Sequence, residues 1–178
     1  MFRHRAHCRV IYGDTDQMGV VYYANYLRWF EMARTEMFRA LGVSYGEIEA
    51  RGIALPVLEA FCKYHSPARY DDRIAVETTL DPAVRAGMKF DYRVFRIEGN
   101  AGEAASGTSG ADSAEALLAE GYTRHVCLNA SGRAVRPPKF LLTAIAAAES
   151  ASPGPGRDAS PRSPASSPGS PPPGESRP

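Results

Sequence analysis

Two carboxylates, two glycines and several tyrosines lie close together near the start of the chain. They fall within residues 12–26, directly before a long helical pattern, and the segment reads Tyr12-Gly13-Asp14-Thr15-Asp16-Gln17-Met18-Gly19-Val20-Val21-Tyr22-Tyr23-Ala24-Asn25-Tyr26. Gly, Asp and Thr favour turns because they bond local backbone or tolerate unusual dihedral angles. A carboxylate on such a turn can attack a carbonyl carbon or activate a water. The free N–H groups at the start of the following helix can stabilise the resulting oxyanion. Residue types alone do not choose between Asp14 and Asp16.

The helix that must position this turn is predicted over residues 23–41. Apolar side chains recur every three or four positions and place one stripe on the helix, formed by Tyr23, Leu27, Phe30, Ala33, Met37 and Leu41. Trp29 and Phe38 widen the apolar surface, so the helix needs cover on more than one side, as a curled sheet would give. Arg28 and Glu31 fall on the other side, three residues apart, where they can pair.

The rest of the chain predicts the sheet that covers this helix. Alternating patterns indicate strands over residues 4–12, 55–64, 73–80, 88–98 and 117–128, with short helices over 44–51 and 140–148. One long helix with about five mostly antiparallel strands makes an α+β domain. The Gly/Ala/Ser-rich residues 99–115 are expected to form a long, mobile hairpin connection.

Composition divides the chain into a domain over residues 1–149 and a disordered Pro/Ser/Gly-rich tail over 150–178, which holds most of the 14 prolines. A formal net charge of +1 argues against a nucleic-acid binder. The three cysteines are far apart and odd in number, so a zinc site or a disulfide framework is not expected. Neither a secretory signal nor a membrane-spanning run is evident, and we expect a cytoplasmic protein with no membrane insertion.

The segment over residues 12–26 resembles the signature of the hotdog-fold acyl-CoA thioesterases. The nearer relatives are the 4-hydroxybenzoyl-CoA thioesterases and the thioesterase associated with the Tol–Pal envelope system. Supporting motifs follow in the family's order: Arg28-Trp29-Phe30-Glu31, Ser66-Pro67-Ala68-Arg69-Tyr70-Asp71-Asp72, Ala119-Glu120-Gly121-Tyr122-Thr123-Arg124-His125-Val126-Cys127 and Arg136-Pro137-Pro138. The resemblance covers residues 4–140. Two departures are Tyr23, where many close relatives carry histidine, and the long segment 99–115.

The family implies a long central helix wrapped by a curved antiparallel sheet. It also implies a homodimer or homotetramer with active sites at the subunit interface, and neither a metal nor an organic cofactor. The resemblance singles out Asp16 as the catalytic carboxylate, acting as nucleophile or as general base. It leaves Asp14 and Asn25 as residues that shape the turn, with Asn25 either capping the helix or holding the turn.

Other residues are expected to bind substrate. Tyr23 matches the position whose backbone N–H points at the thioester oxygen in the family, so the resemblance implies that role for it here. Gly19 either lets the backbone approach substrate closely or serves only as a turn glycine, and Tyr22 either lines the acyl pocket or belongs to the core. Glu31 either contacts the far end of an aromatic acyl group or forms a surface ion pair with Arg28.

The phosphates of coenzyme A need cationic partners, which arginine supplies through its forked donors. Arg85, in the bend where members of the family often place a basic residue, is the candidate phosphate ligand, and Lys89 and Arg69 are weaker candidates. For each of the three, a solvated surface charge is the alternative reading and the one that the residue type alone favours. The four histidines show no metal-ligand spacing and are assigned no chemistry.

These residues predict an acyl-CoA thioesterase that releases a short aliphatic or aromatic acid and free CoA. Two alternatives stay open from the sequence. The acyl group can be carried by acyl carrier protein instead, or the domain can bind acyl-CoA as a sensor or scaffold without hydrolysing it. A hydratase of the same fold is disfavoured, because the Asp–His dyad of that group has no evident match.

Overall fold

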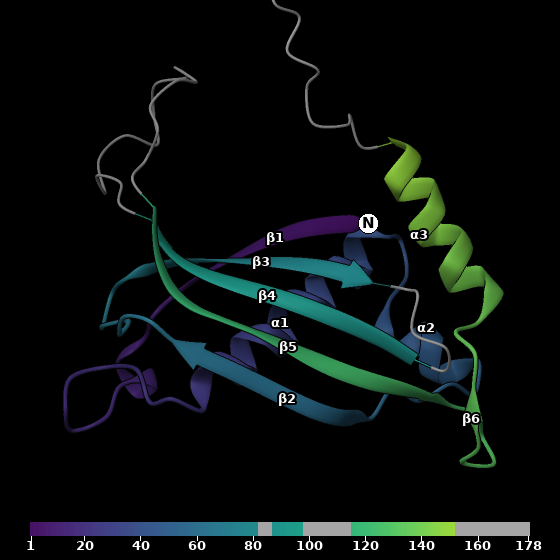
Figure 1. Ribbon diagram of the computed structural model, residues 1–178, viewed down its shortest axis with the longest axis horizontal. Helices are drawn as coiled ribbons and strands as arrows, with labels where there is room; N and C mark the ends of the chain where they lie inside the picture. The colour runs from purple at the N-terminus through teal and green to yellow at the C-terminus, as the bar shows by residue number, and fades with distance from the viewer. Residues whose placement is uncertain (82–86, 98–114, 152–178) are drawn as a thin grey trace, which may run out of the picture.

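The computed structural model describes residues 1–81, 87–97 and 115–151. It confirms the α+β architecture, in which one long helix lies against one face of a curved antiparallel sheet (Figure 1). The helices are α1 (Asn25–Ala40), α2 (Tyr45–Ala50) and α3 (Lys139–Ala151), with a short 3-10 turn, η1, over Tyr12–Asp14. The strands are β1 (Phe2–Arg9), β2 (Val57–Tyr64), β3 (Arg73–Asp81), β4 (Gly87–Ile97), β5 (Glu115–Leu128) and β6 (Ala134–Val135).

The five long strands follow the order β1-β3-β4-β5-β2, and every neighbouring pair is antiparallel. The two-residue β6 pairs with the end of β5 and adds a short sixth strand. Each of the five predicted strands is present, and its observed ends lie within a few residues of the predicted ones. The largest difference is β1, which ends at Arg9 because residues 12–14 turn into η1. Asp14, the first carboxylate of the signature, lies in this turn, and the predicted turn at this position is confirmed.

Helix α1 buries one broad face against the sheet. Phe30, Ala33 and Met37 have no exposed surface, and Phe30 stacks on Tyr92 of β4 with ring centroids 4.2 Å apart. The predicted stripe is wrong at its start, since Tyr23 is 61% exposed and Leu27 is 39% exposed. The helix begins only at Asn25, so Tyr23 belongs to the preceding turn, outside the packed region.

A glycine of β5 allows this close packing. A Cβ built on Gly121 would lie 2.2 Å from the carbonyl oxygen of Phe61 and 2.9 Å from Cε2 of Phe30. No side chain fits between these two groups, so the approach of α1 and β2 to β5 depends on glycine at this position.

Beneath the middle of α1, the sheet and the helix are joined by a buried network of hydrogen bonds instead of apolar contacts. Nδ1 of His125 is 3.0 Å from the carbonyl oxygen of Leu55, and its Nε2 is 3.3 Å from Nη1 of Arg34. A carbonyl only accepts, so Nδ1 carries the proton and Nε2 accepts from the guanidinium. Thr123 extends the network, since its Oγ1 lies 2.9 Å from Nε2 of His125 and 3.0 Å from the hydroxyl of Tyr92. These bonds tie α1, β4, β5 and the entry to β2 together.

Helix α3 lies beside the start of β1 (Figure 1). Its Glu149 accepts from the ammonium group of Met1 at 2.6 Å, and the Arg51 guanidinium lies over the Phe140 ring at 4.2 Å. The helix reaches Ala151, two residues beyond the predicted domain boundary. The rest of the predicted tail, most of the predicted 99–115 connection and Arg85 lie outside the described residues. No helix within the described ranges is long and apolar enough to span a membrane.

Candidate functional site

Asp14 is a structural residue of the signature turn. Its side chain is buried, and its Oδ2 accepts from the backbone N–H of Ile11 at 3.1 Å. Its Oδ1 faces Arg28 at 3.5 Å, and its carbonyl oxygen accepts from the side-chain amide of Asn25 at 2.9 Å. Arg28 therefore pairs with Asp14, not with Glu31 as one sequence reading allowed. Asn25 holds the turn, and its capping alternative is wrong because Ala24 is the cap residue.

Asp16 lies at the tip of the same loop with one oxygen held and the other available. Its Oδ1 accepts from the backbone N–H of Met18 at 2.8 Å, and its carbonyl oxygen accepts from Gly19 N–H at 2.9 Å. No residue of the described chain donates a hydrogen bond to Oδ2. A half-exposed carboxylate with a fixed orientation and one free oxygen is a suitable nucleophile or base.

Gly19 closes this loop in a conformation that favours glycine. Its φ is +70°, and an added Cβ would meet no described atom within 4 Å. The backbone angle, not crowding, accounts for glycine here. The turn reading of Gly19 is therefore supported by its geometry, and its close approach to substrate stays a prediction.

The loop is tied to the bend that follows β2. Thr15 and Val21 form an isolated antiparallel bridge, and Val21 N–H donates to the carbonyl oxygen of Ala68 at 2.9 Å. The backbone N–H of Ala68 in turn donates to the hydroxyl of Tyr26 at 3.0 Å. These bonds bring two sequence motifs, the signature and the Ser66–Asp72 bend, into contact.

The backbone entering α1 presents two free donors. The carbonyl oxygen of Tyr22 accepts from Asn25 N–H at 2.9 Å, and that of Tyr23 accepts from the Tyr64 hydroxyl at 3.1 Å. Among the described residues, none accepts from the N–H of Tyr23 or of Ala24. Two successive free N–H groups at the positive end of a helix suit an anion or a developing oxyanion.

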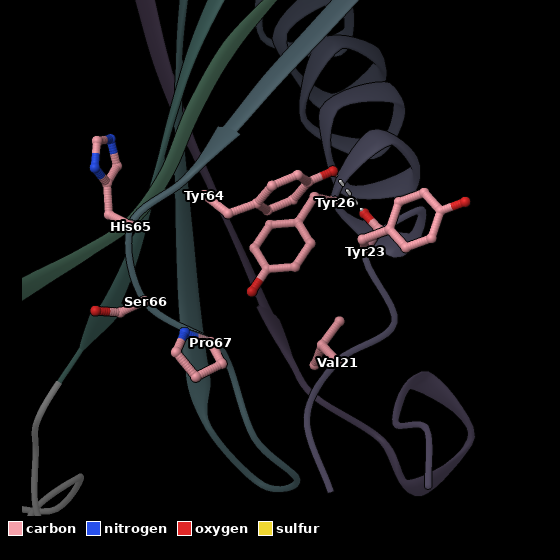
Figure 2. Close-up of a pocket in the computed structure, with 7 residues that line it drawn as sticks. All are labelled: Val21, Tyr23, Tyr26, Tyr64, His65, Ser66 and Pro67. Atoms are coloured by element: carbon pink, nitrogen blue, oxygen red, sulfur yellow. Dashed lines mark hydrogen bonds between the residues drawn. The ribbon is translucent and has the colours of Figure 1, made fainter. Parts of the chain in front are cut away.

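A hollow of about 250 Å³ opens beside this helix start. We call it the tyrosine hollow; it is lined by Val21, Tyr23, Tyr26, Tyr64, His65, Ser66 and Pro67. Figure 2 shows the three tyrosine rings grouped at the start of α1, whereas the side chains of His65 and Ser66 point away from them. The walls are mostly aromatic and apolar, as a site for a small acyl group requires.

Other residues that the sequence predicts for the site lie outside the tyrosine hollow. Tyr22 is 45% exposed, so its reading as a core residue is wrong. Its ring packs at a tilt against Tyr23, with ring centroids 4.5 Å apart, and it is not among the residues that line the hollow. Glu31 lies exposed further along α1, beside Arg28 and Thr35 rather than at the hollow. Arg69, one of the cationic candidates, lies beside the signature, with Nη1 3.5 Å from the carbonyl oxygen of Gly19.

Sequence reasoning missed Tyr26 and Tyr64 as site residues. Tyr26 fits the apolar stripe of the helix and Tyr64 ends a strand, so neither pattern marks a binding role. The available signal was a tyrosine two residues before Ser66-Pro67, at the end of a predicted strand. Only the pairing of β2 with β5 fixes where that end lies.

Comparisons with known proteins agree on the family. The family model described as the thioesterase-like superfamily matches residues 10–145. The acyl-CoA thioester hydrolase YbgC of Escherichia coli O6:H1 is 37% identical over 90 residues, which cover 51% of this chain and 67% of that protein.

Several solved structures share the architecture, among them the following two. The hypothetical protein TT1821 of Thermus thermophilus has a TM-score of 0.66 and 34% identity, covering 80% of this chain and 97% of that one. Slr0204 of Synechocystis, a 1,4-dihydroxy-2-naphthoyl-CoA thioesterase, has a TM-score of 0.67 and 26% identity, covering 82% and 96%. The hotdog fold expected from the sequence is confirmed.

Proposed function

Because the chain belongs to the thioesterase-like superfamily, we propose that it is an acyl-CoA thioesterase that hydrolyses short aliphatic or aromatic acyl-CoA to the free acid and CoA. One observation carries the proposal: the half-held carboxylate of Asp16 belongs to a loop that is bonded to the entry of α1, where the N–H groups of Tyr23 and Ala24 are free.

Asp16 drives the reaction in either of two ways. As a nucleophile, its free oxygen attacks the thioester carbon and expels the CoA thiolate, and water then hydrolyses the mixed anhydride. As a general base, it takes a proton from a water that attacks the same carbon. Both routes place negative charge on the thioester oxygen, which the Tyr23 N–H stabilises.

The tyrosine hollow sets the acyl range of the proposal. Its size and its aromatic walls fit a short or single-ring acyl group, and chains that outgrow it lose contact with the walls. Gly19 and Tyr22 flank the path of the thioester in this proposal. Contact of Glu31 with an aromatic acyl group and contact of Arg85 with CoA phosphates stay predictions.

A homodimer or homotetramer is part of the proposal, supported by the free edge of the sheet. Strand β2 ends the order of the described strands, and four of its apolar side chains are exposed: Val57, Leu58, Phe61 and Tyr64. An apolar edge strand of this length is a template for pairing with a second copy. Because Tyr64 also lines the hollow, such pairing would place the site at the subunit boundary. A cytoplasmic location stays a prediction as well.

Thiol release from a panel of acyl-CoAs tests the activity and the role of Asp16. Asp16→Asn is expected to lower kcat by at least about 10²-fold while leaving the melting temperature near that of the parent. Asp14→Asn is the matched control in the same turn, because it weakens a buried hydrogen bond and the pair with Arg28 and should lower the melting temperature. Unchanged turnover in Asp16→Asn would overturn the assignment.

A further inference from the structure

We infer that Tyr64 is a positioning residue for the reaction, and that its hydroxyl fixes the Tyr23–Ala24 peptide so that the N–H of Ala24 serves as a second oxyanion donor. This inference rests on the proposed thioesterase function. It adds to that function a role for the free N–H of Ala24, and a role for the end of β2 in holding the peptide that carries this N–H.

The first step is the hydrogen bonding of the two peptides that enter α1. In the Tyr22–Tyr23 peptide, the carbonyl is held by the N–H of Asn25 at 2.9 Å. In the Tyr23–Ala24 peptide, the carbonyl has a poor backbone partner, because Tyr26 N–H lies 3.4 Å away. The Tyr64 hydroxyl, at 3.1 Å, is its closer donor (Figure 2). The second peptide is thus oriented chiefly by a side chain from β2.

The second step follows from the electronic coupling within a peptide. A donor on the carbonyl oxygen polarises the whole amide and strengthens the N–H on its other end as a donor. The N–H of Ala24 has no acceptor in the described part of the chain, so this polarised group is free for a ligand. Oriented donors that need no rearrangement stabilise a developing oxyanion most effectively.

The third step is the fixed placement of Tyr64 itself. Its ring packs edge-on against Tyr26 at 5.1 Å, and its strand is paired with β5 at Ala119. Partial desolvation raises the pKa of the Tyr64 hydroxyl above its usual range, so the hydroxyl stays protonated and can donate at neutral pH. The ring is therefore in position, and the hydroxyl is protonated, before substrate binds.

The test compares Tyr64→Phe with Tyr122→Phe. The first keeps the ring in the hollow and removes only the hydroxyl. The second removes a tyrosine hydroxyl bonded to exposed Glu59, on a residue that does not line the hollow. We expect Tyr64→Phe to lower kcat about three- to tenfold with KM unchanged, which is the range for losing one neutral hydrogen bond. Tyr122→Phe should keep the parent kcat. Equal kcat in Tyr64→Phe and the parent, or a loss confined to KM, would overturn the inference.

A second readout does not depend on activity. In ¹⁵N-labelled protein, Tyr64→Phe should shift the backbone amide resonance of Ala24, and Tyr122→Phe should leave it in place. An unmoved Ala24 resonance in Tyr64→Phe would also overturn the inference. Failure of the proposed function shows differently, as an Asp16→Asn variant that keeps its turnover whatever the Tyr64 result.

Discussion

The buried imidazole of His125 should make the stability of this protein sensitive to mild acid. Its side chain is almost fully buried, its Nδ1 donates to Leu55, and its Nε2 faces the Arg34 guanidinium at 3.3 Å. Burial lowers the pKa of His125 below the ordinary 6.5, the hydrogen bond to Leu55 partly offsets this, and the Arg34 cation lowers the pKa further. A second proton would have to sit on Nε2, directly against that cation.

The sign and size of the effect follow from proton linkage. Just below pH 6.5, His125 is protonated in the unfolded chain but stays neutral in the folded protein, where its pKa is lower. The free energy of unfolding contributed by this group is therefore complete above pH 6.5 and is lost as pH falls toward the lower folded pKa. One proton gives a slope of at most about 1.4 kcal/mol per pH unit within that window.

Urea unfolding of the parent and of His125→Asn between pH 5 and 8 measures this slope. The Asn amide can keep the donor to Leu55 but does not titrate. The variant should be less stable at neutral pH, by about 1–3 kcal/mol, because Arg34 loses its acceptor. The difference between the two proteins should narrow as the pH falls below 6.5, and contributions from His4 and the carboxylates cancel in it. Parallel curves for the two proteins would refute the reasoning.

Two further predictions concern the sheet. Gly121→Ala should destabilise the fold by about 3 kcal/mol or more in urea unfolding, because the new Cβ would lie 2.2 Å from a backbone oxygen that is fixed in the sheet. Gly46→Ala, in α2 with no atom within 4 Å of the new Cβ, should instead stabilise the fold by about 0.4–1 kcal/mol. Equal effects of the two substitutions would contradict this packing argument. Leu58→Glu, at a position that is 67% exposed, should leave the fold intact but shift a dimer toward monomer in light scattering; an unchanged mass would argue against β2 as the subunit contact.

Much of the fold followed from patterns along the chain. The spacing of Phe30, Ala33 and Met37 predicted α1 because each faces the sheet at a period near 3.6. The same pattern failed at Tyr23, since periodicity continues through a turn whose residues lack a packing partner. Boundaries set by local hydrogen bonds, such as η1 after β1, leave little trace in hydrophobic spacing.

The site was less predictable than the fold. The resemblance selected Asp16 over Asp14, and the hydrogen bonds of Asp14 agree that it shapes the turn. Tyr64 could not be selected, because its contact with Tyr23 joins residues 41 positions apart. His125 showed no ligand spacing, and its burial against Arg34 depends on the pairing of β5 beneath α1.

The glycine of β5 also limits how this sheet can misfold. Alternation of apolar and polar residues disfavours a shift of one residue in the pairing register of a strand, because such a shift turns every side chain to the wrong face of the sheet. It does not reject slips by two, which keep each side chain on its face. A two-residue slip of β5 would bring Ala119 or Thr123 to the place of Gly121, where any Cβ collides with the Phe61 carbonyl and the Phe30 ring. Gly121 therefore excludes the slips that hydrophobic patterning allows, and it fixes a single register for β5 against β2.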